Sequence, residues 1–196
     1  MVIACVDPQK DVDGLHPLNA GRIASGLPAL APCASLAWMS LTKSVHASLE
    51  GMKAIVISRS TRVGRPLAQM LLNGNVMVTI AHSRSHDLPQ LCAGADLVYS
   101  AIGRPEVVRG AWTKPGATVV DVGICVVQKS DGVARLKGDV ALQAAWKVAG
   151  ESTPVPGGVG PVTVACLLAN TVGAACAIRG LPPPSILDDC LVRPLS

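Results

Sequence analysis

The chain has 196 residues, of which 49% are hydrophobic and 15% charged, so it can bury a sizeable core and is too apolar to be disordered. Its net charge is +4 and its aromatic content 2%, which supply neither the basic surface nor the stacking side chains of a nucleic-acid-binding protein. None of the seven cysteines forms a C-x-x-C pair, so we expect reduced thiols in a cytoplasmic protein, with no metal site and no disulfide framework.

Four short apolar runs in the middle of the chain are predicted to be buried β-strands, at residues 53–58, 76–81, 96–102 and 117–122. Residues 63–73 have the spacing of a helix with one apolar face, and Gly74 follows as a stop signal. A second helix is predicted over 88–95. Continuous apolar strands that alternate with helices are typical of a parallel sheet covered on both faces. The sequence therefore predicts an α/β fold with a Rossmann-like, doubly wound parallel sheet.

A charge-free run over 162–178 is predicted to be a further helix, preceded by a loop rich in proline and glycine over 153–161. The run is nearly as long as a membrane span, but it contains Thr163, Asn170 and Thr171. We therefore expect a buried helix and no membrane partner. The first fifty residues do not fit the alternation of strands and helices, and a loop occupies much of their beginning.

Ligands of a doubly wound sheet bind beyond the carboxyl ends of its strands, which directs attention to four loops, 58–64, 81–87, 102–106 and 123–127. The first loop opens a helix and contains hydroxyls and guanidinium groups, a combination that suits an anion. Only Gly64 stands where a G-x-G-x-x-G turn has three glycines. A solvated basic loop therefore remains an alternative to a dinucleotide site.

The second strand is followed by His82, Ser83, Arg84 and Ser85, with no acidic residue until Asp87. An NAD site usually has a carboxylate at this position for the ribose 2′-hydroxyl. Hydrogen-bond donors without a carboxylate suit a 2′-phosphate instead, because guanidinium groups bind phosphate through paired charge-assisted bonds. The pattern favours NADP over NAD, while an exposed loop arginine remains the alternative for Arg84.

Several longer motifs occur in order along the chain: DVDGLHPLN at 11–19, RSTRVGRP at 59–66, KPGA at 114–117, DVGI at 121–124, GDV at 138–140 and TPVPGGVGP at 153–161. In these motifs the chain resembles the bifunctional methylenetetrahydrofolate dehydrogenase/methenyltetrahydrofolate cyclohydrolase family, from about residue 7 to residue 175. The resemblance implies an NADP-dependent enzyme of one-carbon metabolism with a small folate substrate. The apolar segments at the two ends of the chain favour association, as a homodimer or with a partner chain.

The resemblance assigns roles to ten residues of this sequence. Those implied to bind the cofactor are Ser58, Arg59 and Ser60 at its phosphates, Ser83 near the 2′-phosphate, and Ile124 and Thr163 around the nicotinamide. Those implied to bind folate are Asp13, at the pterin ring, and Pro156, Gly157 and Gly160, in a loop over the substrate. A turn-forming aspartate before Gly14 is the alternative for Asp13. The resemblance further implies a division into a remnant of the folate lobe (1–34), an NADP-binding domain (35–152), and a ligand loop with a C-terminal helix and tail (153–196).

Two departures from the family pattern affect the expected activity. The family has a catalytic lysine in a Y-x-x-x-K motif of its N-terminal lobe, whereas the single tyrosine here, Tyr99, is followed four residues later by Gly103. No catalytic residue can therefore be assigned, and a cofactor-binding pseudoenzyme or a partner-dependent subunit is the alternative to an active enzyme. Ser58 stands where the family has glycine, and we expect it to weaken phosphate binding by crowding or by a strained, positive φ.

Overall fold

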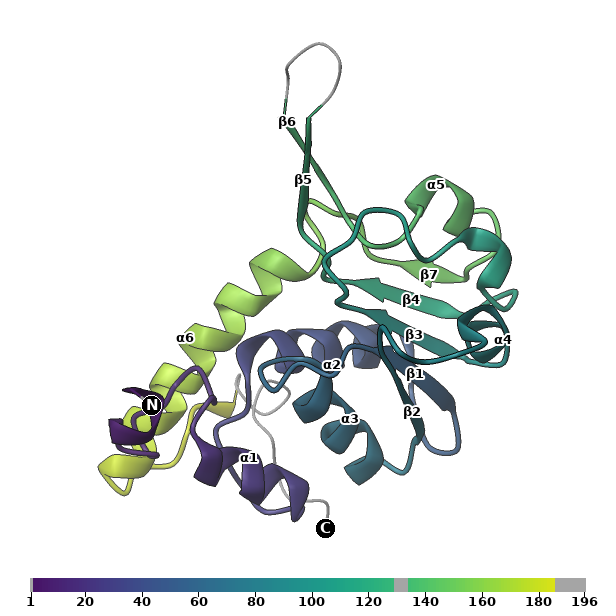
Figure 1. The fold of residues 1–196 in the computed structure, drawn as a ribbon. Coiled ribbons are helices and arrows are strands. Elements are labelled where there is room, and N and C mark those ends of the chain that lie inside the picture. Colours follow the sequence, from purple (N-terminus) through teal and green to yellow (C-terminus); the bar gives the residue numbers. More distant parts are fainter. Residues whose placement is uncertain (1, 129–133, 186–196) are drawn as a thin grey trace.

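The computed structural model describes residues 2–128 and 134–185 and contains a five-stranded parallel sheet (Figure 1). The strands are β1 (Lys53–Ile57), β2 (Met77–Ala81), β3 (Leu97–Ser100), β4 (Thr118–Asp121) and β7 (Glu151–Ser152). Their order across the sheet is β2-β1-β3-β4-β7. The four predicted strands are all present, and the predicted α/β class with a parallel sheet is confirmed.

Helices cover both faces of the sheet. Successive side chains of a strand point to opposite faces, so each strand contributes to two separate cores. One face, which includes Val56 and Val120, packs against α2 (Cys33–Val45) and α3 (Gly64–Asn73). The other face, which includes Ile55 and Val119, packs against α4 (Leu88–Ala93), the short helix η2 (Gly110–Trp112) and α5 (Leu142–Ala145). The predicted helices over 63–73 and 88–95 correspond to α3 and α4. The doubly wound arrangement follows from this division of the helices between the two faces.

Strand β2 differs from the buried strand that its composition predicts. It lies at the edge of the sheet, and the side chains of Met77 and Ile80 are 60% and 42% exposed. Among the described strands, β1 alone pairs with it. An apolar run can therefore identify a strand without revealing whether that strand has a neighbour on each side.

Several elements were not predicted. They are the helices η1 (Val2–Cys5), α1 (Pro17–Ala24), α2, η2 and α5, the strand β7, and the antiparallel pair β5 (Cys125–Gln128) and β6 (Ala134–Lys137). Strand β5 begins inside the range 123–127 that was expected to be a ligand loop. Helix α1 begins after His16, whose Nδ1 accepts a hydrogen bond from the backbone N–H of Leu18. Histidine is not one of the usual N-cap residues, so this start signal was not apparent in the sequence.

The predicted C-terminal helix is present as α6 (Val159–Ile178), but the expectation that it is buried is wrong. Only 22% of its most apolar 18-residue stretch is buried, and the side chains of Val164 and Leu168 are 60% and 64% exposed. It packs mainly on α2 (Figure 1). Among the described residues it is the one helix whose length and composition would suffice to cross a membrane.

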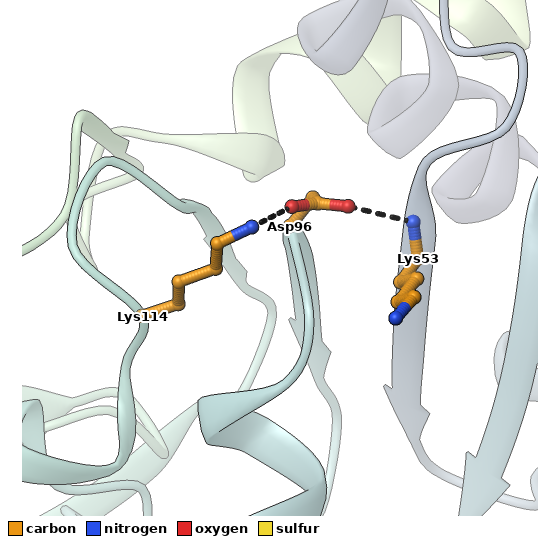
Figure 2. A network of polar contacts seen from close by, with 3 residues as sticks. All are labelled: Lys53, Asp96 and Lys114. Atoms are coloured by element: carbon orange, nitrogen blue, oxygen red, sulfur yellow. Dashed lines mark hydrogen bonds and ion pairs between the residues drawn. The ribbon is translucent and has the colours of Figure 1, made fainter.

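The amino-terminal edge of the sheet is held together by Asp96 (Figure 2). Its carboxylate accepts a hydrogen bond from the backbone N–H of Lys53 at 2.9 Å and forms an ion pair with Lys114. The Lys114 ammonium and then the Lys53 N–H hold the pKa of Asp96 below its usual range. Asp96 therefore links the starts of β1 and β3 to the segment that leads into β4.

We expect Asp96→Asn to destabilise the protein at neutral pH by roughly 0.5–1 kcal/mol, as is typical of a partly exposed ion pair. A carboxylate whose folded pKa is lowered stabilises the folded state above its unfolded pKa, and this contribution is lost as pH falls through the folded pKa. The difference between wild type and variant should therefore disappear at strongly acidic pH. Urea unfolding of wild type and variant between neutral and strongly acidic pH tests the expectation, with Glu50→Gln as the control at an exposed carboxylate. A difference that does not change with pH would contradict it.

Candidate functional site

The carboxyl ends of β2, β1 and β3 lie next to one another at one edge of the sheet. From β1 the chain crosses to β2 over one face and then to β3 over the other, so the topological switch point lies between β1 and β3. In doubly wound folds this crevice is where dinucleotides bind. The loops after β1, β2 and β3, which the sequence singled out, therefore meet at one edge.

The loop after β1 forms a compact turn that leads into α3. The hydroxyl of Ser58 is turned inward, where it accepts a hydrogen bond from the backbone N–H of Ser60 at 3.3 Å. A side chain at Gly64 would overlap the backbone of Ser58, so this position requires glycine. Arg59 and Ser60 are exposed. Phosphate oxygens could therefore reach a guanidinium, a hydroxyl and the N-terminus of a ten-residue helix here.

Ser58 does not adopt the left-handed backbone conformation that its glycine-like position suggested. The described non-glycine residues with positive φ are Asn75, Asp87 and Glu106. Backbone strain at Ser58 is thus excluded as a reason for weak phosphate binding. Crowding of the phosphate by the serine side chain remains the expectation.

The loop after β2 presents Ser83 and Arg84 to solvent. Its turn is closed by the hydroxyl of Ser85, which accepts the N–H of His82 at 3.0 Å, and by Nδ1 of His82, which accepts the N–H of Arg84 at 3.1 Å. His82 is therefore a turn-forming residue. The Ser83 hydroxyl and the Arg84 guanidinium make no hydrogen bond to a described residue, so both are free to bind a phosphate.

Of the two residues expected at the nicotinamide, one lies just after β4 and the other lies in α6. Ile124 follows β4 and is 68% exposed. Thr163 lies in the first turns of α6, where its hydroxyl donates to the carbonyl of Val159 at 3.0 Å. Val159 belongs to the same core cluster as Val120 of β4, which brings the start of α6 to the carboxyl edge of the sheet.

Asp13 lies on the loop before α1 and is exposed. The turn-forming role falls to Asp11 instead, because its buried carboxylate accepts the N–H groups of Leu15 and His16 at 3.1 and 2.8 Å. Within the described parts of the chain, the Asp13 carboxylate receives one long contact, from the thiol of Cys33 at 3.8 Å. Burial, and then the charge of Asp13, raises the pKa of that thiol to about 11. Asp13 therefore retains free acceptor positions for a ligand.

The side chain of Asn170 fixes the Asp13 loop to α6. Its Nδ2 donates to the carbonyls of Val12 and Ala31 at 2.8 and 3.0 Å, and the side chain is 1% exposed. The start of the same helix lies at the sheet edge. Helix α6 is thus the element that joins the candidate folate residue Asp13 to the candidate nicotinamide residue Thr163.

The loop over 153–158 connects the sheet edge to α6, so the predicted loop over 153–161 ends earlier than expected. It begins at Thr153, whose hydroxyl accepts the N–H of Asp121 at 2.9 Å. Pro156 follows a cis peptide bond, and Gly157 has a φ of +102°, which a residue with a side chain rarely adopts. Pro156 and Gly157 are exposed on the loop, and Gly160, expected on the same loop, is exposed in the first turn of α6. The backbone of this loop is therefore accessible beside the candidate nicotinamide residues.

Two buried carboxylates at this edge, Asp121 and Asp139, were not recognised as site residues. They are 3% and 0% exposed. The sequence does contain glycines near both, since Gly123 follows Asp121 by two residues and Gly138 directly precedes Asp139. In the structure a side chain at Gly123 would overlap Asp139, and one at Gly138 would overlap Asp121. Burial raises the pKa of Asp121 to about 6, against hydrogen bonds from the N–H groups of Val140, Gly123 and Asp139.

Tyr99 is part of the core and not of the site. Its ring stacks on Trp38 with centroids 5.4 Å apart, and its hydroxyl is hydrogen-bonded to that of Thr42 at 2.8 Å. Burial raises the pKa of the Tyr99 hydroxyl above its usual value. A fully buried tyrosine cannot take the place of the tyrosine of the family's lysine motif.

The sequence profile of the family described as tetrahydrofolate dehydrogenase/cyclohydrolase, NAD(P)-binding domain, matches residues 32–179. Proteins described as "Bifunctional protein FolD" from Nitrobacter hamburgensis and Bradyrhizobium diazoefficiens are 66% identical over 185 residues. These matches cover 94% of this chain and 63% of each relative, so the chain spans less than two thirds of their length.

Solved structures give the same assignment. The bifunctional FolD methylenetetrahydrofolate dehydrogenase/cyclohydrolase from Campylobacter jejuni superposes with a TM-score of 0.84 at 40% identity, over 90% of this chain and 62% of that one. The Trypanosoma brucei methylenetetrahydrofolate dehydrogenase-cyclohydrolase, solved with NADP and an inhibitor, gives 0.84 at 39% identity, again over 90% and 62%.

Proposed function

The chain belongs to the tetrahydrofolate dehydrogenase/cyclohydrolase family, and on this basis we propose that it is the NADP-binding part of a methylenetetrahydrofolate dehydrogenase/methenyltetrahydrofolate cyclohydrolase. The observation that supports the choice of NADP is the set of free donors at the sheet edge. Arg59, Ser83 and Arg84 are exposed there, and the loop after β2 has no carboxylate before Asp87. A ribose 2′-phosphate would satisfy these donors, whereas the 2′-hydroxyl of NAD would leave them unpaired.

The proposed roles follow the order of the loops along the sheet edge. Ser60 binds the phosphates that NADP and NAD share, with Ser58 shaping their turn, while Arg59 and Ser83 bind the 2′-phosphate. Ile124 and Thr163 face the nicotinamide, which accepts the hydride of methylenetetrahydrofolate when NADP is bound. Asp13 accepts N–H bonds from the pterin edge, because a carboxylate can accept two such bonds side by side. Pro156, Gly157 and Gly160 cover the folate and exclude water from the transfer.

We further propose that 35–152 is the NADP-binding domain, while 1–34 and 153–196 belong to a folate lobe. The exposed apolar side chains of α6 support this division, among them Val164 and Leu168. A soluble protein rarely leaves such a row of apolar side chains uncovered. We also propose that the protein is cytoplasmic, because that location agrees with a role in folate metabolism and with the reduced state expected of its cysteines.

A chimera tests the proposed activity. The part of the Nitrobacter hamburgensis relative that lies outside the match is joined to this chain, and NADP-dependent oxidation of methylenetetrahydrofolate is followed by NADPH absorbance. We expect turnover within about tenfold of the intact relative, since 66% identity leaves the cofactor edge largely unchanged. A folded chimera that binds NADP but has no turnover would contradict the proposal.

We propose that the protein is a homodimer formed through β5 and β6. This strand pair stands out from the body (Figure 1), and an isolated two-stranded pair is at best marginally stable in water. Val126 and Leu136 on it are 67% and 46% exposed. A second copy placed about a two-fold axis would cover the same side chains in both protomers.

We expect Val126→Lys to convert the dimer to a monomer, because it places a charge in the proposed apolar interface. Sedimentation velocity at several concentrations measures the change. Leu72→Lys is the matched control, since Leu72 is 56% exposed on α3, away from β5 and β6. A wild-type protein that is monomeric at all concentrations would overturn this assignment.

A further inference from the structure

The carboxylates of Asp121 and Asp139 are the buried acidic groups at the carboxyl edge of the sheet. Neither forms an ion pair with a residue in the described parts of the chain. Backbone N–H groups compensate them instead. Burying a charge is costly unless it is fully hydrogen-bonded, so an arrangement of this kind persists only where its hydrogen bonds are all made.

Asp139 accepts hydrogen bonds from three consecutive N–H groups of the loop after β3. They belong to Ile102, Gly103 and Arg104, the last two at 3.3 and 2.9 Å. The hydroxyl of Ser100, at the end of β3, donates to the same carboxylate at 3.1 Å. Successive N–H groups that converge on an anion form a nest, and here the anion is part of the protein. The loop after β3 is thus wrapped around the Asp139 side chain.

Asp121 in turn fixes Asp139. Its carboxylate accepts the N–H groups of Asp139 and Val140 at 3.1 and 2.8 Å, and that of Gly123 at 2.8 Å. Gly123 directly precedes Ile124. The two carboxylates therefore connect the loop after β3 with the loop after β4.

The 102–104 loop has a backbone conformation that requires glycine at position 103. Its φ is +74°, and a Cβ at this position would meet no atom within 4 Å. Glycine is therefore needed for the backbone conformation and not for space. That conformation is the one that aims three N–H groups at Asp139.

The strand order places this loop in the cofactor crevice. Because the order is β2-β1-β3-β4, the loop after β3 lies across the switch point from β1, on the side away from β2. If the 2′-phosphate lies at β2, the nicotinamide half extends over β3 toward β4. We propose that Asp139 is a positioning residue, whose buried carboxylate holds the 102–104 loop in the shape that binds the nicotinamide half of NADP. This inference rests on the proposed cofactor site.

The proposal predicts that a substitution at Asp139 lowers the affinity for NADP but not the affinity for a ligand that contains only the adenosine half. In Asp139→Asn an amide replaces one oxygen and faces backbone donors, so the loop loses part of its nest. NADP affinity should fall at least about tenfold, because at least one charge-assisted bond is lost. Affinity for adenosine 2′,5′-bisphosphate, which contains only the adenosine half, should stay within about twofold, since its contacts lie at β1 and β2. A purely structural role of Asp139 would weaken both ligands together.

Substitutions at two glycines test the proposal without replacing either buried carboxylate. Gly103→Ala strains the loop at φ +74°, while Gly116→Ala adds the same strain at φ +79° on the segment before β4, at the opposite edge of the sheet. Both sites have open space for a methyl group. We expect Gly103→Ala to weaken NADP binding at least about threefold, because the strain shifts the loop out of the shape that binds the nicotinamide half, and to leave the affinity for the bisphosphate unchanged. Gly116→Ala should change neither affinity.

Calorimetric titrations of the full chain with both ligands give the result. Unchanged NADP affinity in Gly103→Ala and in a folded Asp139→Asn, or equal loss of both ligands, would overturn the positioning role while leaving the NADP site in place. A wild-type protein that binds neither ligand would instead remove the proposed cofactor site, and this inference with it.

Discussion

Methylenetetrahydrofolate dehydrogenase turnover by the 196-residue chain on its own is expected to fall about a hundredfold to ten-thousandfold below that of an intact relative, which is the usual effect of removing a general acid or base. The resemblance to the family assigns ring opening and proton transfer to the lysine of a Y-x-x-x-K motif. The sequence contains no such motif, and its single tyrosine, Tyr99, is buried in the core. NADPH absorbance in a purified sample with methylenetetrahydrofolate and NADP measures the turnover.

Three of the described lysines do not offer a substitute at the cofactor edge. Lys53 and Lys114 lie with Asp96 at the opposite edge of the sheet, and Lys137 is paired with Glu106 at 2.6 Å. Turnover at the ordinary level of the family would contradict the expectation. In that case Lys10, which lies on the same loop as Asp13, would be the first lysine to replace by alanine.

Arg59→Ala is expected to weaken NADP binding about tenfold to a hundredfold and to remove most of the preference for NADP over NAD. One charge-assisted hydrogen bond is worth roughly 1.5–3 kcal/mol, which corresponds to that range of affinity. Arg59 is exposed on the turn before α3, and it can reach toward Ser83 and Arg84 because β1 and β2 are neighbours. NAD affinity should change little, since NAD has no 2′-phosphate for the guanidinium to bind.

Arg65→Ala provides the control for Arg59→Ala. It removes the same charge from the exposed surface of α3, so it reports the general electrostatic attraction of the edge for an anion. We expect an effect of about twofold or less at physiological ionic strength, where exposed charges are largely screened. Equal losses in the two variants would mean that Arg59 acts through its charge alone and does not contact the 2′-phosphate.

The sheet could be predicted from the sequence because its central strands are short, apolar and separated by helical segments. Strand β1 and helix α3 show this best: the predicted inward face of α3 contains Leu67 and Leu71, both fully buried. The exposure of β2 and α6 could not be predicted in the same way. Apolar composition reports what a segment prefers to contact, while exposure depends on which other elements lie beside it.

The sequence proposes site residues where a side chain has a direct chemical reason to be there, as at Arg59, Ser83 and Asp13. All three are exposed, and their roles stay predictions. The sequence could not separate Asp13 from Asp11, because both precede Gly14 in one short motif. Only the hydrogen bonds show that Asp11 closes the turn and leaves Asp13 free. Asp139 was missed for a related reason, since its partners are backbone N–H groups that lie 35–37 residues earlier in the chain.

We expect the chain to bind NADP at the carboxyl edge of its sheet and to recognise the 2′-phosphate there. The most direct test is a calorimetric titration of the wild-type chain with NADP and, separately, with NAD at the same ionic strength. We predict one site per chain and a dissociation constant for NADP at least about tenfold below that for NAD, as expected for one charge-assisted contact to the 2′-phosphate. Equal dissociation constants for the two nucleotides, or no binding of either, would contradict the account.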